Sequence, residues 1–290
     1  MIWIAITVFN RIELTKRCLQ SILRQSYNGY KIVICDDGSE DGTWEIIESQ
    51  FPDVILLKGN GDLWWTGGTN RCVRYILEHC KDSDYVLTLN NDAELHSAHL
   101  EKMVYWSARK PDSILTSVVY DIENREMPVY VGSIKNFFTT KEKQLTPHPK
   151  GGFAGIAEIT HAPGYATLIP VKIFRRIGIF DEKWFPHYGA DYEFTYRAAK
   201  NRYKIFVNYD AKIYLHVETT GFSFSKGKGS LREFLSYLSN RKSPAKFVTR
   251  WRLAVRYCPP LLLPSYLLID NFLVIGSYLR FWIVKKTKNR

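Results

Sequence analysis

Three polar residues, Asn90, Asn91 and Asp92, directly follow an apolar, β-prone run over residues 85–89. The run predicts a short buried strand. A carboxylate at the carboxyl end of a strand in an open α/β sheet lies where such sheets bind ligands. Hard cations such as Mg²⁺ and Mn²⁺ take oxygen ligands and often join a protein to substrate phosphates, so Asp92 is a candidate cation ligand. The alternative is a plain turn that starts a helix near His96.

Two more predicted strands end in polar residues that would share this edge. Residues 2–8 form an apolar run that stops at residues 9–11, and residues 30–35 form another that stops at residues 36–39. Strand and helix patterns alternate through the first half, which predicts an α/β fold with a mostly parallel central sheet and helices on both faces. The carboxyl ends of these strands would gather at one edge and favour a nucleotide-type ligand. Neither a G-x-G-x-x-G loop nor a P-loop is present, so the nucleotide would be held in another way.

Three stretches at these strand ends together resemble the nucleotide-sugar motifs of glycosyltransferase family 2. They are residues 7–11 (TVFNR), 35–41 (CDDGSED) and 90–92 (NND). Residues 59–71 (GNGDLWWTGGTNR) are similar to the bacterial rhamnosyltransferase-like branch, and the resemblance covers residues 1 to about 220. It implies an inverting enzyme with the GT-A fold. Such an enzyme would move a hexose, with L-rhamnose from a dTDP donor as the leading candidate, to a saccharide or lipid-linked acceptor in cell-surface polysaccharide synthesis.

The resemblance assigns the pyrimidine base of the nucleotide to Thr7, Phe9 and Asp37, and it places Arg11 among the residues that bind the donor. The chemistry of Asp37 agrees with this role, because a carboxylate accepts hydrogen bonds and both uracil and thymine present an N3–H group. A nucleotide-diphosphate sugar is therefore the expected donor.

The metal motif of the family, D-x-D, is altered in this chain. Asp92 matches the metal-binding acid, but Asn90 replaces the first Asp and removes one negative charge from a site for Mg²⁺ or Mn²⁺. Asn90 would then contact the ribose. His216, after a strand expected over residues 211–215, matches a late histidine that joins the metal site in the family. A hydrogen bond to the diphosphate is the alternative, because imidazole suits Mn²⁺ better than Mg²⁺.

The stretch Trp64-Trp65 permits two interpretations. One of the two rings is expected in the core beneath the sheet, whereas Trp65, beside the Gly67-Gly68 turn, would face the sugar pocket. The glycine turn is expected to precede a helix that runs through Leu77. Asn70 would open this helix, where free backbone N–H groups favour a diphosphate.

Asp191 and Glu193 are predicted to begin a helix that runs to Lys200. Two acids in a first helical turn also complement the helix dipole, which is the plainer interpretation. By the resemblance, Asp191 is the general base, since inverting transfer needs one carboxylate to deprotonate the acceptor hydroxyl. Glu193 would orient the acceptor or the helix. Lys226 lies in a polar stretch that is either a solvated loop or a lid over the diphosphate.

Charge divides the chain near Asn240. The chain of 290 residues has 40 Lys and Arg against 29 Asp and Glu, and 11 of these cations but only one acid, Asp270, fall in residues 241–290. We therefore expect a glycosyltransferase domain over residues 1–240 and a basic, apolar helical extension over residues 241–290. Residues 265–284 are long enough to span a membrane but carry Asp270 and Arg280, which favours an in-plane amphipathic anchor on anionic lipid. A packed C-terminal subdomain or a dimer interface is the alternative, and the oligomeric state stays open.

The five cysteines are scattered without C-x-x-C spacing, and no basic segment precedes the apolar start, so we expect neither a disulfide scaffold nor a signal peptide. The expected location is cytoplasmic, at the inner face of the cell membrane. A basic tail is also typical of nucleic-acid-binding proteins, but this tail mixes its charge with a long apolar run, so no nucleic acid is expected. A nucleotidyltransferase on a similar sheet would carry a Gly-rich, basic loop after the first strand, which residues 9–11 are not.

Overall fold

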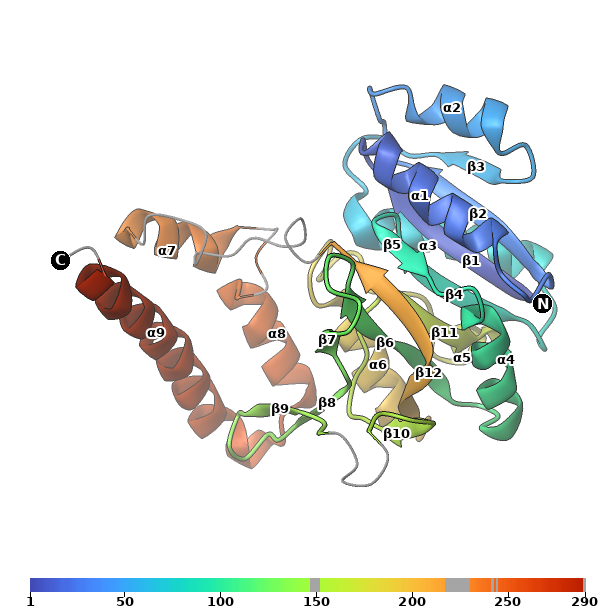
Figure 1. The fold of residues 1–290 in the computed structure, drawn as a ribbon. Helices are drawn as coiled ribbons and strands as arrows, with labels where there is room; N and C mark the ends of the chain where they lie inside the picture. Colours follow the sequence, from blue (N-terminus) through green and yellow to red (C-terminus); the bar gives the residue numbers. More distant parts are fainter. Residues whose placement is uncertain (147–151, 217–229, 241–242, 244, 289–290) are drawn as a thin grey trace.

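The computed structural model describes residues 1–146, 152–216, 230–240, 243 and 245–288 (Figure 1). The first half alternates strands and helices as predicted. Its elements are β1 (Ile2–Val8), α1 (Ile12–Leu23), β2 (Tyr30–Asp36), α2 (Thr43–Gln50), β3 (Ile55–Lys58), α3 (Trp64–His79), β4 (Tyr85–Asn90), β5 (Ala93–Leu95) and α4 (His99–Arg109). Residues 91–92 do form a turn, and the helix expected near His96 begins at His99, but the short strand β5 lies between the turn and that helix.

The second half adds shorter strands and the C-terminal helices. Its elements are β6 (Ile114–Asp121), β7 (Pro128–Tyr130), β8 (Ser133–Lys135), β9 (Glu142–Gln144), β10 (Ile156–Glu158), β11 (Ala166–Pro170), α5 (Val171–Ile177), α6 (Ala190–Lys200), β12 (Ile205–Leu215), α7 (Leu231–Ser239), α8 (Phe247–Tyr257), the 3₁₀ turn η2 (Pro260–Leu262) and α9 (Leu263–Lys288). The β8–β9 hairpin forms a small sheet of its own.

The central sheet is mixed. Its strand order is β10-β12-β6-β11-β4-β1-β2-β3, with β5 on β12 and β7 on β6. The strands β3, β2, β1 and β4 are parallel, as predicted, but β11 runs antiparallel to both β4 and β6. The strands β6 and β12 are parallel to each other, and because β11 is antiparallel to both β4 and β6, they point the same way as the first four strands. Six of the eight strands along this order therefore run in one direction, with β10 and β11 reversed, and the prediction of a mostly parallel sheet is confirmed within a mixed sheet.

Helices cover both faces of this sheet (Figure 1). Successive strand side chains point to opposite faces, and in β1 Trp3 and Ala5 belong to one buried cluster while Ile4 and Ile6 belong to the other. The first cluster includes residues of α3, α5 and α6, and the second includes residues of α1 and α4. The sheet thus lies in the middle layer, and its carboxyl edge is left to the loops.

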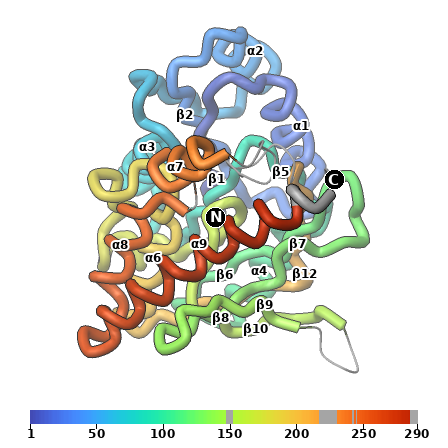
Figure 2. Tube along the Cα trace, turned by 90° about the vertical axis from the view of Figure 1, so that its left-hand side faces the viewer, coloured from blue at the N-terminus to red at the C-terminus, as the bar shows by residue number. Residues whose placement is uncertain are grey.

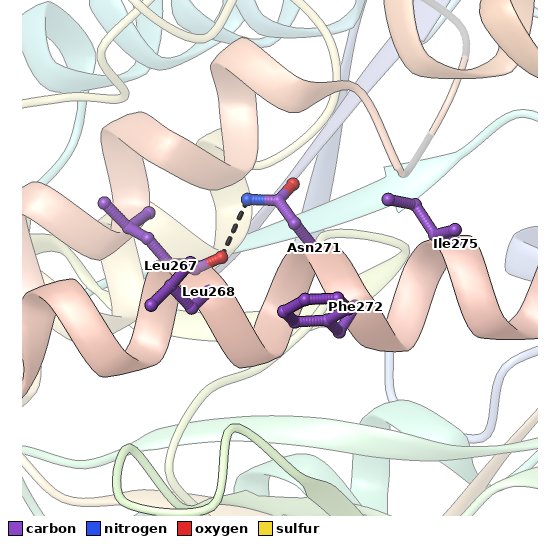
Figure 3. Close-up of a pocket in the computed structure, with 5 residues that line it drawn as sticks. All are labelled: Leu267, Leu268, Asn271, Phe272 and Ile275. Atoms are coloured by element: carbon purple, nitrogen blue, oxygen red, sulfur yellow. Dashed lines mark hydrogen bonds between the residues drawn. The ribbon is translucent and has the colours of Figure 1, made fainter.

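The C-terminal helices lie beside this domain, with α9 crossing the near side of the molecule in Figure 2. One side of α9 packs inward: Asp270 pairs with Arg250 of α8, and the Tyr278 ring stacks on Phe234 of α7 at 4.1 Å. The other side is apolar and exposed. Its exposed large side chains are Leu268, Ile269, Phe272, Leu273, Ile275, Leu279, Trp282, Ile283 and Val284. Figure 3 shows an open hollow on this helix, lined by Leu267, Leu268, Asn271, Phe272 and Ile275.

Within the described residues, one helical stretch is long and apolar enough to cross a membrane by length and composition. It covers Pro260–Val284, with a mean hydropathy of 1.5. Only 6% of its most apolar 18-residue stretch is buried. Burial is so low because the helix contacts the protein on one side only.

Candidate functional site

The parallel strands bring the three predicted motifs to one edge. Thr7 of β1 pairs with Cys35 of β2 on one side and with Asn90 of β4 on the other. Val8, the next residue of β1, pairs with Asp36 of β2. The expected meeting of these motifs at the carboxyl ends of the strands is therefore confirmed.

Asp37 is buried and fixes the loop that precedes α3. Its Oδ1 accepts the backbone N–H of Gly61 at 2.9 Å, and its Oδ2 accepts those of Leu63 at 2.9 Å and Trp64 at 3.0 Å. Gly59 lies so close that a Cβ atom there would come within 2.5 Å of Asp37 Oδ1, so only glycine fits. Three of the four lone-pair sites of the carboxylate are thus in use, and one on Oδ1 remains for an N–H group of a ligand.

Thr7, Phe9 and Arg11 lie around the same edge but face different ways. Thr7 packs on α3, where a Cβ atom at Gly68 would come within 2.3 Å of its methyl group. Phe9 is 55% exposed and so presents a ring at the rim of the site. Arg11 has a left-handed backbone, with φ of 65°, and its Nη1 lies 3.4 Å from Asp92 Oδ2. Arg11 therefore contacts the carboxylate while about half of its side chain stays exposed to solvent.

The helix α3 begins at Trp64, three residues before Gly67, so the expectation of a glycine turn that precedes the helix is wrong. Both Gly67 and Gly68 are buried within α3. The missing Cβ atom of Gly68 lets the helix approach Thr7, and a Cβ atom at Gly67 would come within 3.1 Å of the Leu63 side chain. Asn70 consequently lies inside the helix and not at its start. Its amide donates to the Phe180 carbonyl at 2.8 Å and to Glu182 Oε2 at 2.8 Å. The expectation that Asn70 opens the helix and binds the diphosphate there is wrong, since the side chain ties α3 to the segment before α6.

Trp65 forms a wall of the site, whereas Trp64 turns away from it. The Trp65 indole N–H donates to Asn90 Oδ1 at 3.0 Å, and the Trp65 ring lies edge-on to Phe180 with 5.5 Å between ring centroids. Trp64 instead packs edge-on to His187. The engaged Asn90 oxygen leaves the amide NH₂ of Asn90 to donate to a ligand.

Asp92 is 5% exposed, and within the described part of the chain its Oδ1 has no hydrogen-bond partner. Burial raises the pKa of this carboxyl, and the nearby Arg11 guanidinium opposes the rise. His216 follows β12, and the antiparallel pairing of Leu215 with Ala93 brings His216 beside Asp92. A buried carboxylate oxygen without a partner is costly, so the residues present fit a cation at Asp92 with His216 alongside.

No group of three or more His, Cys, Asp or Glu side chains able to hold a metal occurs among the described residues. A cation at Asp92 would therefore take most of its ligands from substrate phosphates and water, which is the usual arrangement for Mg²⁺. The loss of the first Asp of the motif at Asn90 agrees with this sparse set of protein ligands.

Asp191 stands in the first turn of α6. Its Oδ2 accepts the backbone N–H of Gly164 at 2.9 Å, and its Oδ1 accepts that of Tyr192 at 2.9 Å. Burial raises the pKa of Asp191, while these two N–H groups and the nearby His161 oppose the rise. A carboxylate with a raised pKa is a stronger base than an exposed one, as general-base chemistry near neutral pH requires.

Glu193, two residues further along α6, faces away from Asp191 and is 2% exposed. Its carboxylate accepts hydrogen bonds from Arg197 of the same helix and from Arg256 and Tyr257 of α8. Because protein groups enclose both of its oxygens, the expectation that Glu193 contacts the acceptor is wrong, and the alternative that it orients the helix agrees with these contacts. Lys226 lies outside the described residues.

The comparisons with known proteins address the family directly. Residues 3–178, more than half of the chain, match the model described as Glycosyl transferase family 2. The chain belongs to glycosyltransferase family 2. This membership agrees with the sequence motifs at residues 7–11, 35–41 and 90–92.

Relatives of this glycosyltransferase carry related names. An uncharacterized glycosyltransferase of Rickettsia typhi, RT0329, is 24% identical over 208 residues, which are 68% of this chain and 58% of the relative. The Escherichia coli protein WfaP, a UDP-Glc:alpha-D-GlcNAc-diphosphoundecaprenol beta-1,3-glucosyltransferase, is 29% identical over 111 residues, 36% of this chain and 44% of WfaP. The matched region thus spans about half the length of these two curated relatives.

Solved structures confirm the GT-A-like fold of this glycosyltransferase. GalNAc-T7, crystallised with UDP, GalNAc and Mn²⁺, has a TM-score of 0.62 at 12% identity, over 93% of this chain and 54% of that one. The 1–349 fragment of S. aureus TarS has a TM-score of 0.54 at 14% identity, over 95% of this chain and 91% of that one. At such identities the likeness shows the fold alone.

Sequence reasoning missed two parts of the glycosyltransferase site. Gly164 donates to Asp191 and lies against the Trp65 ring, where a Cβ atom would come within 2.4 Å of that ring. The Pro163-Gly164 dipeptide is a turn signal, but nothing local indicates that this turn meets α6. The strand β5, which brings His216 to Asp92, was hidden because three residues are too few for a periodic pattern.

Proposed function

We propose that this family 2 glycosyltransferase transfers a hexose from a nucleotide-diphosphate sugar to a saccharide or lipid-linked acceptor, with inversion at the anomeric carbon. L-rhamnose from a dTDP donor is the proposed sugar, because residues 59–71 resemble the rhamnosyltransferase-like branch. The observation that carries the proposal is a continuous set of contacts. Trp65 bonds Asn90 and abuts Gly164, and Gly164 bonds Asp191, so the donor edge and the proposed base meet at one indole ring.

In this mechanism the donor binds first along the carboxyl edge of the sheet. The remaining acceptor site on Asp37 takes the N3–H of the pyrimidine, and the exposed Phe9 ring stacks on the base. The Asn90 amide donates to the ribose. The cationic Arg11 contacts Asp92, the proposed cation ligand, and so lies next to the proposed position of the diphosphate. These contacts hold the sugar with its anomeric carbon toward Asp191.

Asp191 then removes the proton of the acceptor hydroxyl as that oxygen attacks the anomeric carbon from the side opposite to the diphosphate. The N–H groups of Gly164 and Tyr192 fix the orientation of the carboxylate. A Mg²⁺ or Mn²⁺ ion held by Asp92, with His216 alongside, would offset negative charge on the departing diphosphate.

We propose further that α9 lies in the plane of the inner membrane surface, as an anchor. Its exposed side is apolar, while the charge of Asp270 is turned toward Arg250. A spanning orientation would break the Arg250–Asp270 pair and the Phe234–Tyr278 stack, whereas an in-plane helix keeps both. Apolar burial at the interface, together with basic residues for anionic lipid, would stabilise this arrangement. The lipid-linked substrate in the name of WfaP supports a lipid-linked acceptor.

Nucleic-acid binding has less support. Basic side chains of α8 are paired with acids of the same chain, Arg250 with Asp270 and Arg256 with Asp181, and so are not aligned for phosphates.

A panel of nucleotide sugars tests the donor. Release of nucleoside diphosphate is measured for dTDP-rhamnose, UDP-glucose and other donors, with Mg²⁺, with Mn²⁺ and with chelator. We expect one donor to react at least tenfold faster than the rest, and only with a divalent cation. Release from a UDP-hexose in place of dTDP-rhamnose would reject the rhamnose assignment alone. Full turnover in chelator would reject the metal.

A further inference from the structure

Glu193 is an ionisable group buried next to the site that has no part in the proposed chemistry. Burying a carboxylate is costly unless charged or polar groups pair with it. Here the pairing is unusually complete for one side chain. Arg197 donates from Nε at 3.1 Å and from Nη2 at 3.0 Å, Tyr257 donates its hydroxyl at 2.7 Å, and Arg256 Nη1 lies at 3.3 Å.

Two of these three partners come from α8, beyond the predicted domain boundary. Arg256 Nη1 also donates to Asp181 Oδ2 at 2.7 Å, so one nitrogen bridges two carboxylates from separate segments. The Arg256 guanidinium lies over the Trp184 ring at 4.5 Å, and Lys200 at the end of α6 donates to the Arg256 carbonyl at 2.7 Å. The helix α8 is therefore bonded to both ends of α6 and is not a detached extension.

A second contact reaches α6 from the β8–β9 hairpin. The Phe137 ring lies between Tyr196 of α6, at 5.9 Å, and Tyr266 of α9, at 5.8 Å. The same hairpin carries Glu142, which pairs at 3.2 Å with the buried His161. Figure 1 shows α8 between α6 and α9. The helix α6, which carries Asp191 in its first turn, is thus held against elements that also contact α9.

We propose that Arg256 and Tyr257 are positioning residues for the catalytic base. By holding Glu193, they fix the first turn of α6 and with it the carboxylate of Asp191. The inference rests on the proposed role of Asp191. The proposal makes α8 part of the catalytic unit. A misplacement of about 1 Å at a reacting group costs about 10²-fold in rate, so a loss of the α8 contacts that shifts Asp191 would slow transfer.

The experiment uses the full-length chain and the variants Arg256→Gln, Arg256→Lys and Tyr257→Phe. Arg252→Gln is the matched control, since Arg252 also lies over the Trp184 ring, at 5.0 Å, while no hydrogen bond joins it to Glu193 among the described residues. Sugar transfer to the acceptor and hydrolysis of the donor by water are both measured, and donor-binding stoichiometry counts the folded sites.

Arg256→Gln should lower transfer about tenfold per folded site, and Tyr257→Phe about threefold, with hydrolysis lowered less because water needs less exact placement than a sugar hydroxyl. Arg256→Lys should recover transfer to within about threefold, since a single cationic nitrogen contacts both carboxylates. Arg252→Gln should transfer at the wild-type rate.

Normal transfer by Arg256→Gln and Tyr257→Phe, with Asp191→Asn inactive, would overturn the positioning role and leave the base assignment intact. Normal transfer by Asp191→Asn would overturn the base assignment and the positioning role together. A parallel loss of transfer, hydrolysis and binding stoichiometry would make the contact purely structural and would also overturn the proposal. If Arg256→Gln does not fold, Tyr257→Phe decides, because it removes one hydroxyl and keeps the ring.

Discussion

Trp65 and Asn90 are joined by a hydrogen bond of 3.0 Å from the indole N–H to the amide oxygen. The bond fixes which way the Asn90 amide points, because the oxygen is engaged and the NH₂ group is left to face the donor. A side chain that replaces an acid in the metal motif is thereby oriented by a neighbour 25 residues away in the chain.

Trp65→Phe removes this bond and keeps most of the ring. The Asn90 amide then rotates freely, so we expect the donor KM to rise about fivefold to tenfold, the value of one hydrogen bond of about 1 kcal/mol. Trp64→Phe is the control, because its ring packs on His187 instead. Equal effects of the two substitutions on KM would show that Trp65 acts only by packing.

Asp92→Asn should abolish transfer and yet stabilise the fold. The pKa of Asp92 is raised by burial, so the ionised form costs stability once the pH exceeds the unfolded-state pKa, and an uncharged amide avoids that cost at neutral pH. We expect a gain of about 1 kcal/mol in the free energy of unfolding, measured by denaturant titration without divalent cations. A loss of stability would mean that the pair with Arg11 outweighs the burial cost.

The same variant tests cation binding without reference to activity. Mn²⁺ together with nucleoside diphosphate should raise the melting temperature of the wild-type protein, because a ligand that binds only the folded state stabilises it. Asp92→Asn should lose this shift. An equal shift in both proteins would place the cation elsewhere.

Asp191→Asn keeps the size of the side chain but cannot take the proton of the acceptor. Donor affinity should change little, while transfer should fall by about 10² to 10⁴, the usual contribution of general-base catalysis. The acid limb of the wild-type pH profile should lie above the ordinary range of Asp, because burial raises the pKa and activity is lost as the pH falls through it. Glu193→Gln should lose less, since it orients the helix. If Glu193→Gln is inactive and Asp191→Asn active, the two roles are reversed.

His99 predicts how the protein responds to acid. It is fully buried with its Nε2 2.8 Å from Ser117 Oγ, and burial lowers its pKa from 6.5 to about 3. Below about pH 6.5 the unfolded chain therefore binds a proton on His99, whereas the folded chain does not. As the pH falls further, His99 lowers the free energy of unfolding by about 1.4 kcal/mol for each pH unit. His99→Gln should flatten the fall of stability between pH 6.5 and 4, measured by urea titration. The exposed His79→Gln is the control, and an unchanged slope in His99→Gln would contradict the assignment.

The exposed side of α9 predicts membrane binding. Phe272 is 70% exposed, so Phe272→Glu places a charge where lipid is expected and should reduce flotation with anionic liposomes at least tenfold without unfolding the domain. Met127→Glu, at another exposed apolar residue, should float normally. Unchanged flotation of Phe272→Glu, or a change from dimer to monomer in place of lost flotation, would favour an interface between two copies of the chain.

The sequence by itself determined the local features of this glycosyltransferase. Residues 2–8 and 85–89 are apolar enough to specify strands, and the polar residues after them necessarily meet at one edge, because parallel strands share their carboxyl ends. The motifs at residues 7–11, 35–41 and 90–92 sufficed for the family, since they lie at strand ends where a ligand selects the residue type.

Only the tertiary structure decided which way each side chain faces. Asn70 and Glu193 carry groups that suit a ligand, but the fold surrounds both with protein donors and acceptors from segments more than 60 residues away. Gly67 and Gly68 resemble a turn in the sequence and serve helix packing in the fold, because the glycine signal is the same for a turn and for a close approach. The long-range pairing that brings β5 to β12, and α8 to α6, depends on burial summed over the whole chain, which no local pattern encodes.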